Sequence, residues 1–183
     1  MKAVMLMFDS LNREMLEPYG CDWVKTPNFR RLAVHSVCFD QCYAGSLPCM
    51  PARRDLQTGR YNMLHRSWGP MEPFDDSMPE LLKNNNVYTH LISDHVHYWE
   101  DGGATYHYRY NSWENIRGQE GDMWKCLPEL FGPCDESKLQ NKDGVYFHAT
   151  QNLQRHDAVN RKFMKTEEDT ALAKTIHGGL EFI

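Results

Sequence analysis

The sequence predicts an α/β fold with a mostly parallel sheet sandwiched by helices, and two observations support this prediction. Short apolar runs typical of strands alternate with segments of helical spacing over the first half of the chain, as expected for strands joined by helical crossovers. The chain has 183 residues, of which 41% are hydrophobic and 25% charged, so one globular domain with a single core is expected.

Three strands are predicted, over residues 3–8, 37–43 and 87–92. The first reads AVMLMF, and such an uninterrupted apolar run is typical of a strand buried on both faces of a parallel sheet. It ends at Asp9. Because ligands bind beyond the carboxyl ends of strands in open α/β sheets, Asp9 stands where a site is expected.

Capping residues and helical spacing predict helices between the strands. Pro27 suits the first turn of a helix, and the glycines at positions 20 and 59 suit the ends of two others, because glycine readily adopts the left-handed conformation found there. Residues 75–77, Asp-Asp-Ser, favour a helix start. The predicted helices cover residues 10–19 (a loop with a short helix), 26–35, about 51–58, 77–82 and 151–174.

Residues 94–124 show neither helical nor strand periodicity and are rich in His, Tyr and Arg. A long aperiodic segment inside a compact chain is more often functional than disordered. Two interpretations stay open: residues 99–109 and 117–122 line a substrate pocket, or they only hold a long loop together.

Charge and hydropathy exclude several function classes. The formal net charge of −5 provides no field that would gather nucleic acid or anionic lipid, so no nucleic-acid partner is expected. The longest apolar run, residues 3–8, is too short to span a membrane, and no export signal follows it. A cytoplasmic protein is therefore expected, with all six cysteines as free thiols. These are Cys21, Cys38, Cys42, Cys49, Cys126 and Cys134.

Residues 49–60 carry the sharpest motif, CMPAR followed by LQTGR. This part of the chain resembles the sulfatase family of the alkaline phosphatase superfamily, whose signature is Cys-x-Pro-x-Arg followed by Leu-x-Thr-Gly-Arg. The resemblance implies that Cys49 is oxidised to formylglycine, whose hydrated aldehyde is the nucleophile. A geminal diol suits this chemistry, because one oxygen attacks sulfur and the second hydroxyl later expels the sulfate. The alternative for Cys49 is a buried structural cysteine.

The resemblance also implies a divalent metal ion held by Asp9 and the oxidised Cys49. Asp9 matches the family's first metal-binding aspartate, whereas Ser10 stands where the family often has a second one. Ca²⁺ is expected first, because it prefers oxygen ligands; Mn²⁺ and Zn²⁺ are alternatives, since a carboxylate is missing. A helix N-cap is the alternative role for Asp9.

Three further residues are expected to act on the sulfate. His97 matches the family histidine that binds the formylglycine and helps to release it, a general-base role that suits imidazole. His95 replaces the family's lysine as a donor to a sulfate oxygen. Arg53 would hold the formylglycine or a sulfate oxygen with its guanidinium fork. A metal-binding pair, or two hydrogen-bonded core residues, are the alternatives for the histidines.

The resemblance is strong over residues 1–125 and weaker over 126–183, so residues 1–183 are expected to form the N-terminal portion of a sulfatase-like catalytic domain, incomplete at its C-terminus. The expected function is hydrolysis of a small sulfated substrate. Phosphodiester or phosphonate monoester hydrolysis and an inactive truncated remnant are the alternatives. The isolated chain is expected to be a fragment, a truncated product or a piece of a cleaved enzyme. It should be inactive by itself, and should self-associate or pair with the missing part of the domain.

Overall fold

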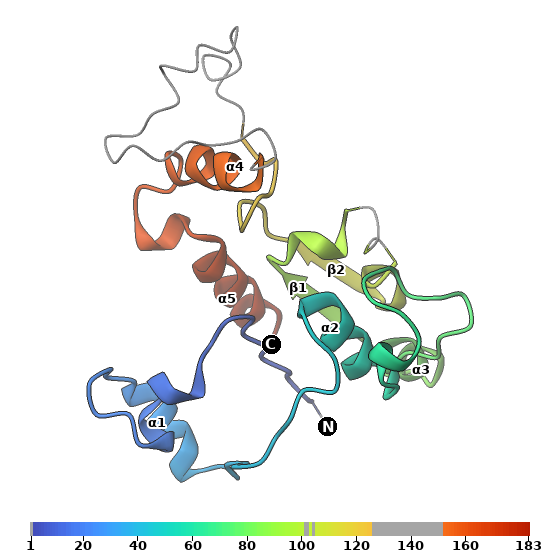
Figure 1. Ribbon diagram of the computed structural model, residues 1–183, viewed down its shortest axis with the longest axis horizontal. Helices are drawn as coiled ribbons and strands as arrows, with labels where there is room; N and C mark the ends of the chain where they lie inside the picture. The colour runs from blue at the N-terminus through green and yellow to red at the C-terminus, as the bar shows by residue number, and fades with distance from the viewer. Residues whose placement is uncertain (1, 101–102, 104, 126–151) are drawn as a thin grey trace, which may run out of the picture.

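The computed structural model describes residues 2–100, 103, 105–125 and 152–183, without the side chains of 152–156 (Figure 1). These residues form an α/β structure in which helices surround one small parallel sheet. Its regular elements are α1 (Pro27–Val34), α2 (Cys49–Thr58), α3 (Met78–Asn84), β1 (His90–Ser93), β2 (Ser112–Asn115), α4 (Asn152–Arg161) and α5 (Ala171–Phe182).

The sheet consists of β1 and β2, paired in parallel from His90 opposite Ser112 to Ser93 opposite Asn115. β1 confirms the core of the strand predicted over 87–92, shifted toward the C-terminus. β2 lies within the segment that shows no periodicity in the sequence. Four residues are too few to display a period, so the strand conformation of β2 depends on its backbone hydrogen bonds with β1.

The strands predicted over residues 3–8 and 37–43 are wrong. Both segments are described without regular secondary structure, and their apolar side chains are exposed, with Val4 and Leu6 each 67% accessible. A strand requires the backbone of a neighbour, and no described segment forms a ladder with either of them. The first segment is instead anchored at its start, where Lys2 Nζ donates to the Ile183 carbonyl at the end of α5 (2.8 Å).

The three central helices confirm their predictions. α1 begins at Pro27, and α3 has Ser77 as its N-cap residue, as the sequence indicates. α2 begins at Cys49, slightly earlier than predicted, and ends where Gly59 adopts a φ of 68° and its N–H donates to the Asp55 carbonyl (2.8 Å). The predicted early helix is a pair of 3₁₀ turns, Arg13–Met15 and Glu17–Tyr19.

The single helix predicted over 151–174 is wrong, because the chain breaks between α4 and α5. Asp169 accepts hydrogen bonds from the backbone N–H groups of Lys165 and Thr166, and Thr170 caps α5 by accepting from the N–H of Ala173. Such side chains compete with helical hydrogen bonds and favour caps. The polar residues of this segment therefore separate α4 from α5 and do not continue a single helix.

The core beside α2 is small and rich in aromatic residues. Met50, Met71, Tyr98 and Tyr106 are buried, and the rings of Tyr98 and Tyr106 lie 5.2 Å apart. Cys49 packs against this cluster. The first turn of α2 is thereby held beside the segment that follows β1, which brings residues from distant parts of the sequence to one place.

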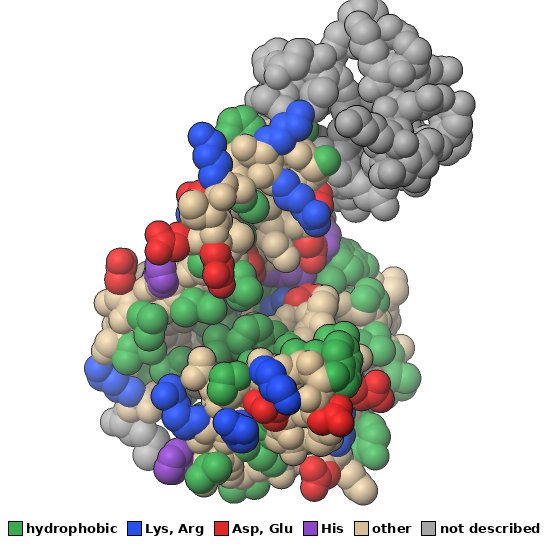
Figure 2. All heavy atoms as spheres, turned by 90° about the vertical axis from the view of Figure 1, so that its left-hand side faces the viewer, with side chains coloured by type: hydrophobic (Ala, Val, Ile, Leu, Met, Phe, Trp, Pro, Cys, Tyr) green, Lys and Arg blue, Asp and Glu red, His purple; other side chains and the backbone are tan. Residues whose placement is uncertain are grey.

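Other parts of the structure are more open. Figure 1 shows α1 away from the sheet, joined to α2 by a long coil, and α5 on the side of β1 away from α3. Hydrophobic side chains spread over the face shown in Figure 2. No helix among the described residues combines the length and the apolar composition needed to cross a membrane.

Candidate active site

Arg53 connects α2 to the N-terminal segment. Its side chain is nearly buried, and Nη2 donates to Asp9 Oδ2 (3.0 Å) while Nη1 donates to the Tyr98 hydroxyl (3.3 Å). Asp9 is therefore held beside the first turn of α2, although the strand predicted before it does not form. Arg53 is nearly buried while the Asp9 side chain is 41% exposed, and a charged donor and acceptor at this distance make a directional contact.

His95 and His97 follow β1 and lie on the same site. Residues Val96–Tyr98 form a 3₁₀ turn that places the two imidazole rings 5.1 Å apart. One ligand atom each of Asp9, Cys49 and His95 lies within 4.8 Å of the others. The structure thus brings together all the side chains singled out in the sequence: Asp9, Cys49, Arg53, His95 and His97.

His95 is neutral at physiological pH in this environment. Its side chain is 3% exposed, and burial together with the Arg53 guanidinium lowers its pKa to about 4. Its Nε2 atom has no hydrogen-bond partner among the described residues. A buried nitrogen without a partner is costly, which suggests that this atom binds a ligand.

The low pKa of His95 predicts a pH-dependent stability. The unfolded chain binds a proton at His95 near pH 6.5 whereas the folded chain does so only near pH 4, so the free energy of unfolding should fall as the pH is lowered between these values. The slope from this one group is at most about 1.4 kcal/mol per pH unit. Urea unfolding at pH 7 and pH 5 should show a smaller difference for His95→Gln than for the wild type; equal differences would contradict the assignment.

His97 lies between two carboxylates. Nε2 contacts Glu120 Oε2 (3.1 Å) and Nδ1 contacts Glu100 Oε1. The contact with Glu120 raises the pKa of His97 despite burial, and the same contact lowers the pKa of Glu120. The Trp68 ring and the imidazole pack edge to face, with 4.8 Å between centroids. The orientation of this imidazole is therefore tightly defined.

The sequence analysis placed Glu100 and Glu120 in segments that could line a substrate pocket, but it gave neither residue a role. The three-residue spacing between His97 and Glu100 could have indicated their contact, because such residues meet within a helical turn. No local pattern joins Glu120 to His97. The sequence analysis also gave no role to Tyr98, whose hydroxyl accepts a hydrogen bond from Arg53.

Cys49 is the first residue of α2 and is partly buried. Burial, followed by the negative charge of Asp9, raises the pKa of its thiol. Only the thiolate is an effective nucleophile, so an unmodified Cys49 is poorly suited to act as one at neutral pH.

Three of these side chains could also hold a metal ion. Asp9, Cys49 and His95 offer one oxygen, one sulfur and one nitrogen within reach of one another, and this mixed donor set fits a divalent ion. With sulfur present it suits Zn²⁺, whereas Ca²⁺ takes six to eight oxygen ligands. Conversion of Cys49 to an oxygen ligand would move the set toward Mn²⁺ or Ca²⁺.

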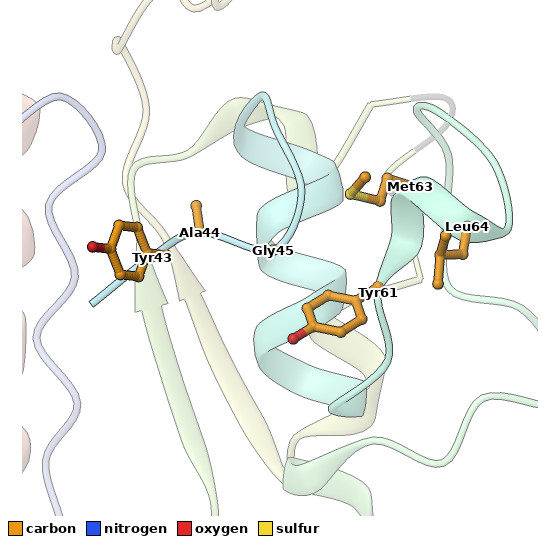
Figure 3. A pocket seen from close by; sticks show the side chains of 6 residues that line it. All are labelled: Tyr43, Ala44, Gly45, Tyr61, Met63 and Leu64. Atoms are coloured by element: carbon orange, nitrogen blue, oxygen red, sulfur yellow. The ribbon is translucent and has the colours of Figure 1, made fainter. Parts of the chain in front are cut away.

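A separate hollow of about 330 Å³ lies between the segments before and after α2 (Figure 3). Gly45 is required there, because a Cβ at this position would lie 2.5 Å from the Tyr61 ring. The lining has no charged side chain and shares no residue with the cluster around Cys49. Its residues are Tyr43, Ala44, Gly45, Tyr61, Met63 and Leu64.

Comparisons with known proteins agree with the motif at the start of α2. A family model described as Sulfatase matches residues 2–167. The N-acetylglucosamine-6-O-sulfatase of Bacteroides thetaiotaomicron is 27% identical over 100 residues, which cover 50% of this chain and 18% of that protein. Iduronate 2-sulfatase of Mus musculus is 25% identical over 154 residues, covering 74% of this chain and 27% of that protein. The chain thus spans only about a fifth to just over a quarter of the length of these relatives. No solved structure matches it.

Proposed function

The chain belongs to the sulfatase family, and on that premise we propose that it carries part of the active site of a sulfuric ester hydrolase, with Cys49 converted to formylglycine. The observation that supports this most is the convergence of Asp9, Cys49, Arg53 and His95 at the start of α2. Members of this set come from three separate segments, so their meeting is a property of the fold. The raised pKa of the Cys49 thiol supports an oxygen nucleophile at the same position.

The proposed chemistry divides among these side chains. The hydrated aldehyde at position 49 would supply the oxygen nucleophile, and a divalent ion held by Asp9, residue 49 and His95 would supply positive charge. Arg53 keeps its charge at every accessible pH and donates toward a sulfate oxygen. His95, which is neutral, donates without adding charge. His97, held between Glu100 and Glu120, moves the proton that accompanies release of the sulfate.

The finer fold assignment is also a proposal. Residues 1–183 would form the N-terminal portion of an alkaline phosphatase-like α/β domain, in which the parallel sheet is extended and sandwiched by helices. The exposed apolar side chains of residues 4–7 and of α1 support this, since sheets of this class are stable when both faces are covered. Either further residues of the domain or a second copy of the chain would cover them.

Replacement of Arg53 by alanine tests the anion site directly. Removal of a charged donor should weaken the affinity of the unconverted chain for inorganic sulfate by about tenfold, the effect of losing one charge-assisted hydrogen bond. A titration followed by NMR spectroscopy would measure it. Arg31→Ala, at an exposed position on α1, is the matched control and should leave the affinity unchanged. Equal affinities of Arg53→Ala and wild type would refute the proposed role of Arg53.

A further inference from the structure

The loop after β2 is built around a buried carboxylate, Asp122, which is paired with the partly exposed guanidinium of Arg117. Asp122 is 4% exposed and accepts two hydrogen bonds from the Arg117 guanidinium, at 2.8 and 2.7 Å, and a third from the N–H of Gly118 at 2.7 Å. Asn160 of α4, fully buried, donates to the Asp122 carbonyl at 2.7 Å. Residues 117–122 are therefore held rigidly against α4.

Glu120 stands at the tip of this loop. Its φ of 51° places it in the left-handed region, which residues other than glycine rarely adopt and which tends to occur at functional positions. Its side chain is 36% exposed, so a ligand can reach it, while Oε2 contacts His97 at 3.1 Å. A rigid loop thus presents a carboxylate, in an unfavourable backbone conformation, at the edge of the proposed active site.

A carboxylate beside an anion site requires an explanation, because it repels the sulfate that Arg53, His95 and His97 would bind. The imidazole of His97 already faces Glu120. Asp9 and Glu100 add further negative charge nearby. The sulfate group is therefore not the part of a substrate that suits Glu120.

We propose that Glu120 determines substrate specificity by accepting a hydrogen bond from a hydroxyl or ammonium group on the alcohol part of the sulfate ester. This inference rests on the proposed function, since it assumes that the sulfate lies beside Arg53 and His97. The preferred substrates are then sulfate esters of polyhydroxy or amino alcohols, the chemistry of sulfated sugars. Aryl sulfates and esters with a further anionic group next to the sulfate are disfavoured.

Two small sulfate esters test the contact between Glu120 and the alcohol part of a substrate. Ethanolamine O-sulfate carries an ammonium two carbons from the ester oxygen, whereas ethyl sulfate has hydrogen in its place, and both are flexible enough to avoid a dependence on ring geometry. NMR titrations of the unconverted chain would give both dissociation constants without turnover. The wild type should prefer ethanolamine O-sulfate by about fivefold, as expected for one partly exposed charge pair. Glu120→Gln, which keeps the shape and removes the charge, should reduce the preference to less than about twofold.

Glu168→Gln, at an exposed position in the 3₁₀ turn before α5, controls for the loss of one negative charge and should keep the wild-type preference. The inference is overturned if Glu120→Gln keeps the preference, or if it changes both affinities by the same factor, since Glu120 would then act only on His97. Ethyl sulfate binding that is insensitive to Arg53→Ala would instead refute the proposed anion site. Failure of the wild type to bind either ester would overturn both proposals.

Discussion

Coexpression with a formylglycine-generating enzyme is expected to convert Cys49 to an aldehyde and to leave the other five cysteines as thiols. Cys49 alone lies in the CMPAR motif, at the start of a helix, so only its surroundings match what such an enzyme is expected to bind. Mass spectrometry of the peptide that contains Cys49 should show the loss of mass that separates a thiol from an aldehyde. An alkylatable thiol at Cys49 under these conditions would contradict the proposed nucleophile.

Matched variants make this result specific. Cys42→Ser removes an exposed cysteine outside the motif and should leave conversion unchanged, whereas Pro51→Ala combined with Arg53→Ala keeps the thiol and removes the motif, and should prevent conversion. Conversion of the double variant would show that the motif does not direct the modification.

The converted chain is then expected to show little or no saturable hydrolysis of an aryl sulfate. Among the described residues only Asp9, residue 49 and His95 stand together as ligands, and a Ca²⁺ ion with six to eight ligands would be held weakly by three. An assay with Ca²⁺, Mg²⁺ and Mn²⁺ checks this. Saturable turnover that Cys49→Ala abolishes would show that these residues are sufficient by themselves.

Replacement of Arg54 by alanine should destabilise the fold by about 3–5 kcal/mol, the typical effect of removing one partner from a buried ion pair. Arg54 is 2% exposed, and its guanidinium donates to both carboxylate oxygens of Asp75, at 2.8 and 2.6 Å, and to Asn62 Oδ1 at 3.0 Å. Asp75 would be left as a buried charge without its counter-ion. Because whole domains are stable by only about 5–15 kcal/mol, this loss is a large share of the total free energy of unfolding.

Urea unfolding followed by circular dichroism measures this effect. Arg54→Lys keeps the charge but cannot form the two parallel hydrogen bonds, so an intermediate loss is expected. Arg31→Ala, at an exposed position, should change the free energy of unfolding by less than about 0.5 kcal/mol. A loss below about 1 kcal/mol for Arg54→Ala would show that the ion pair is not desolvated as the structure indicates.

The elements that the sequence predicted correctly are those with local causes. α1 starts at a proline, α2 ends at a glycine with positive φ, and both features depend on the residue itself. The strands at 3–8 and 37–43 were predicted from apolar runs, which report a tendency to be buried but do not supply the neighbouring backbone that a strand needs. The opposite error was made for β2: no strand was predicted there because the sequence shows no periodicity, but backbone pairing with β1 makes it a strand.

For the site, the sequence by itself determined the candidate residues: the motif at 49–60 led to Cys49 and Arg53, and the family resemblance led to Asp9, His95 and His97. Only the tertiary structure decided what surrounds them. Burial against Arg53 makes His95 neutral, and a loop held by α4 brings Glu120 to His97. Desolvation and contacts between distant segments depend on how the whole chain packs, so no local pattern in the sequence could encode them.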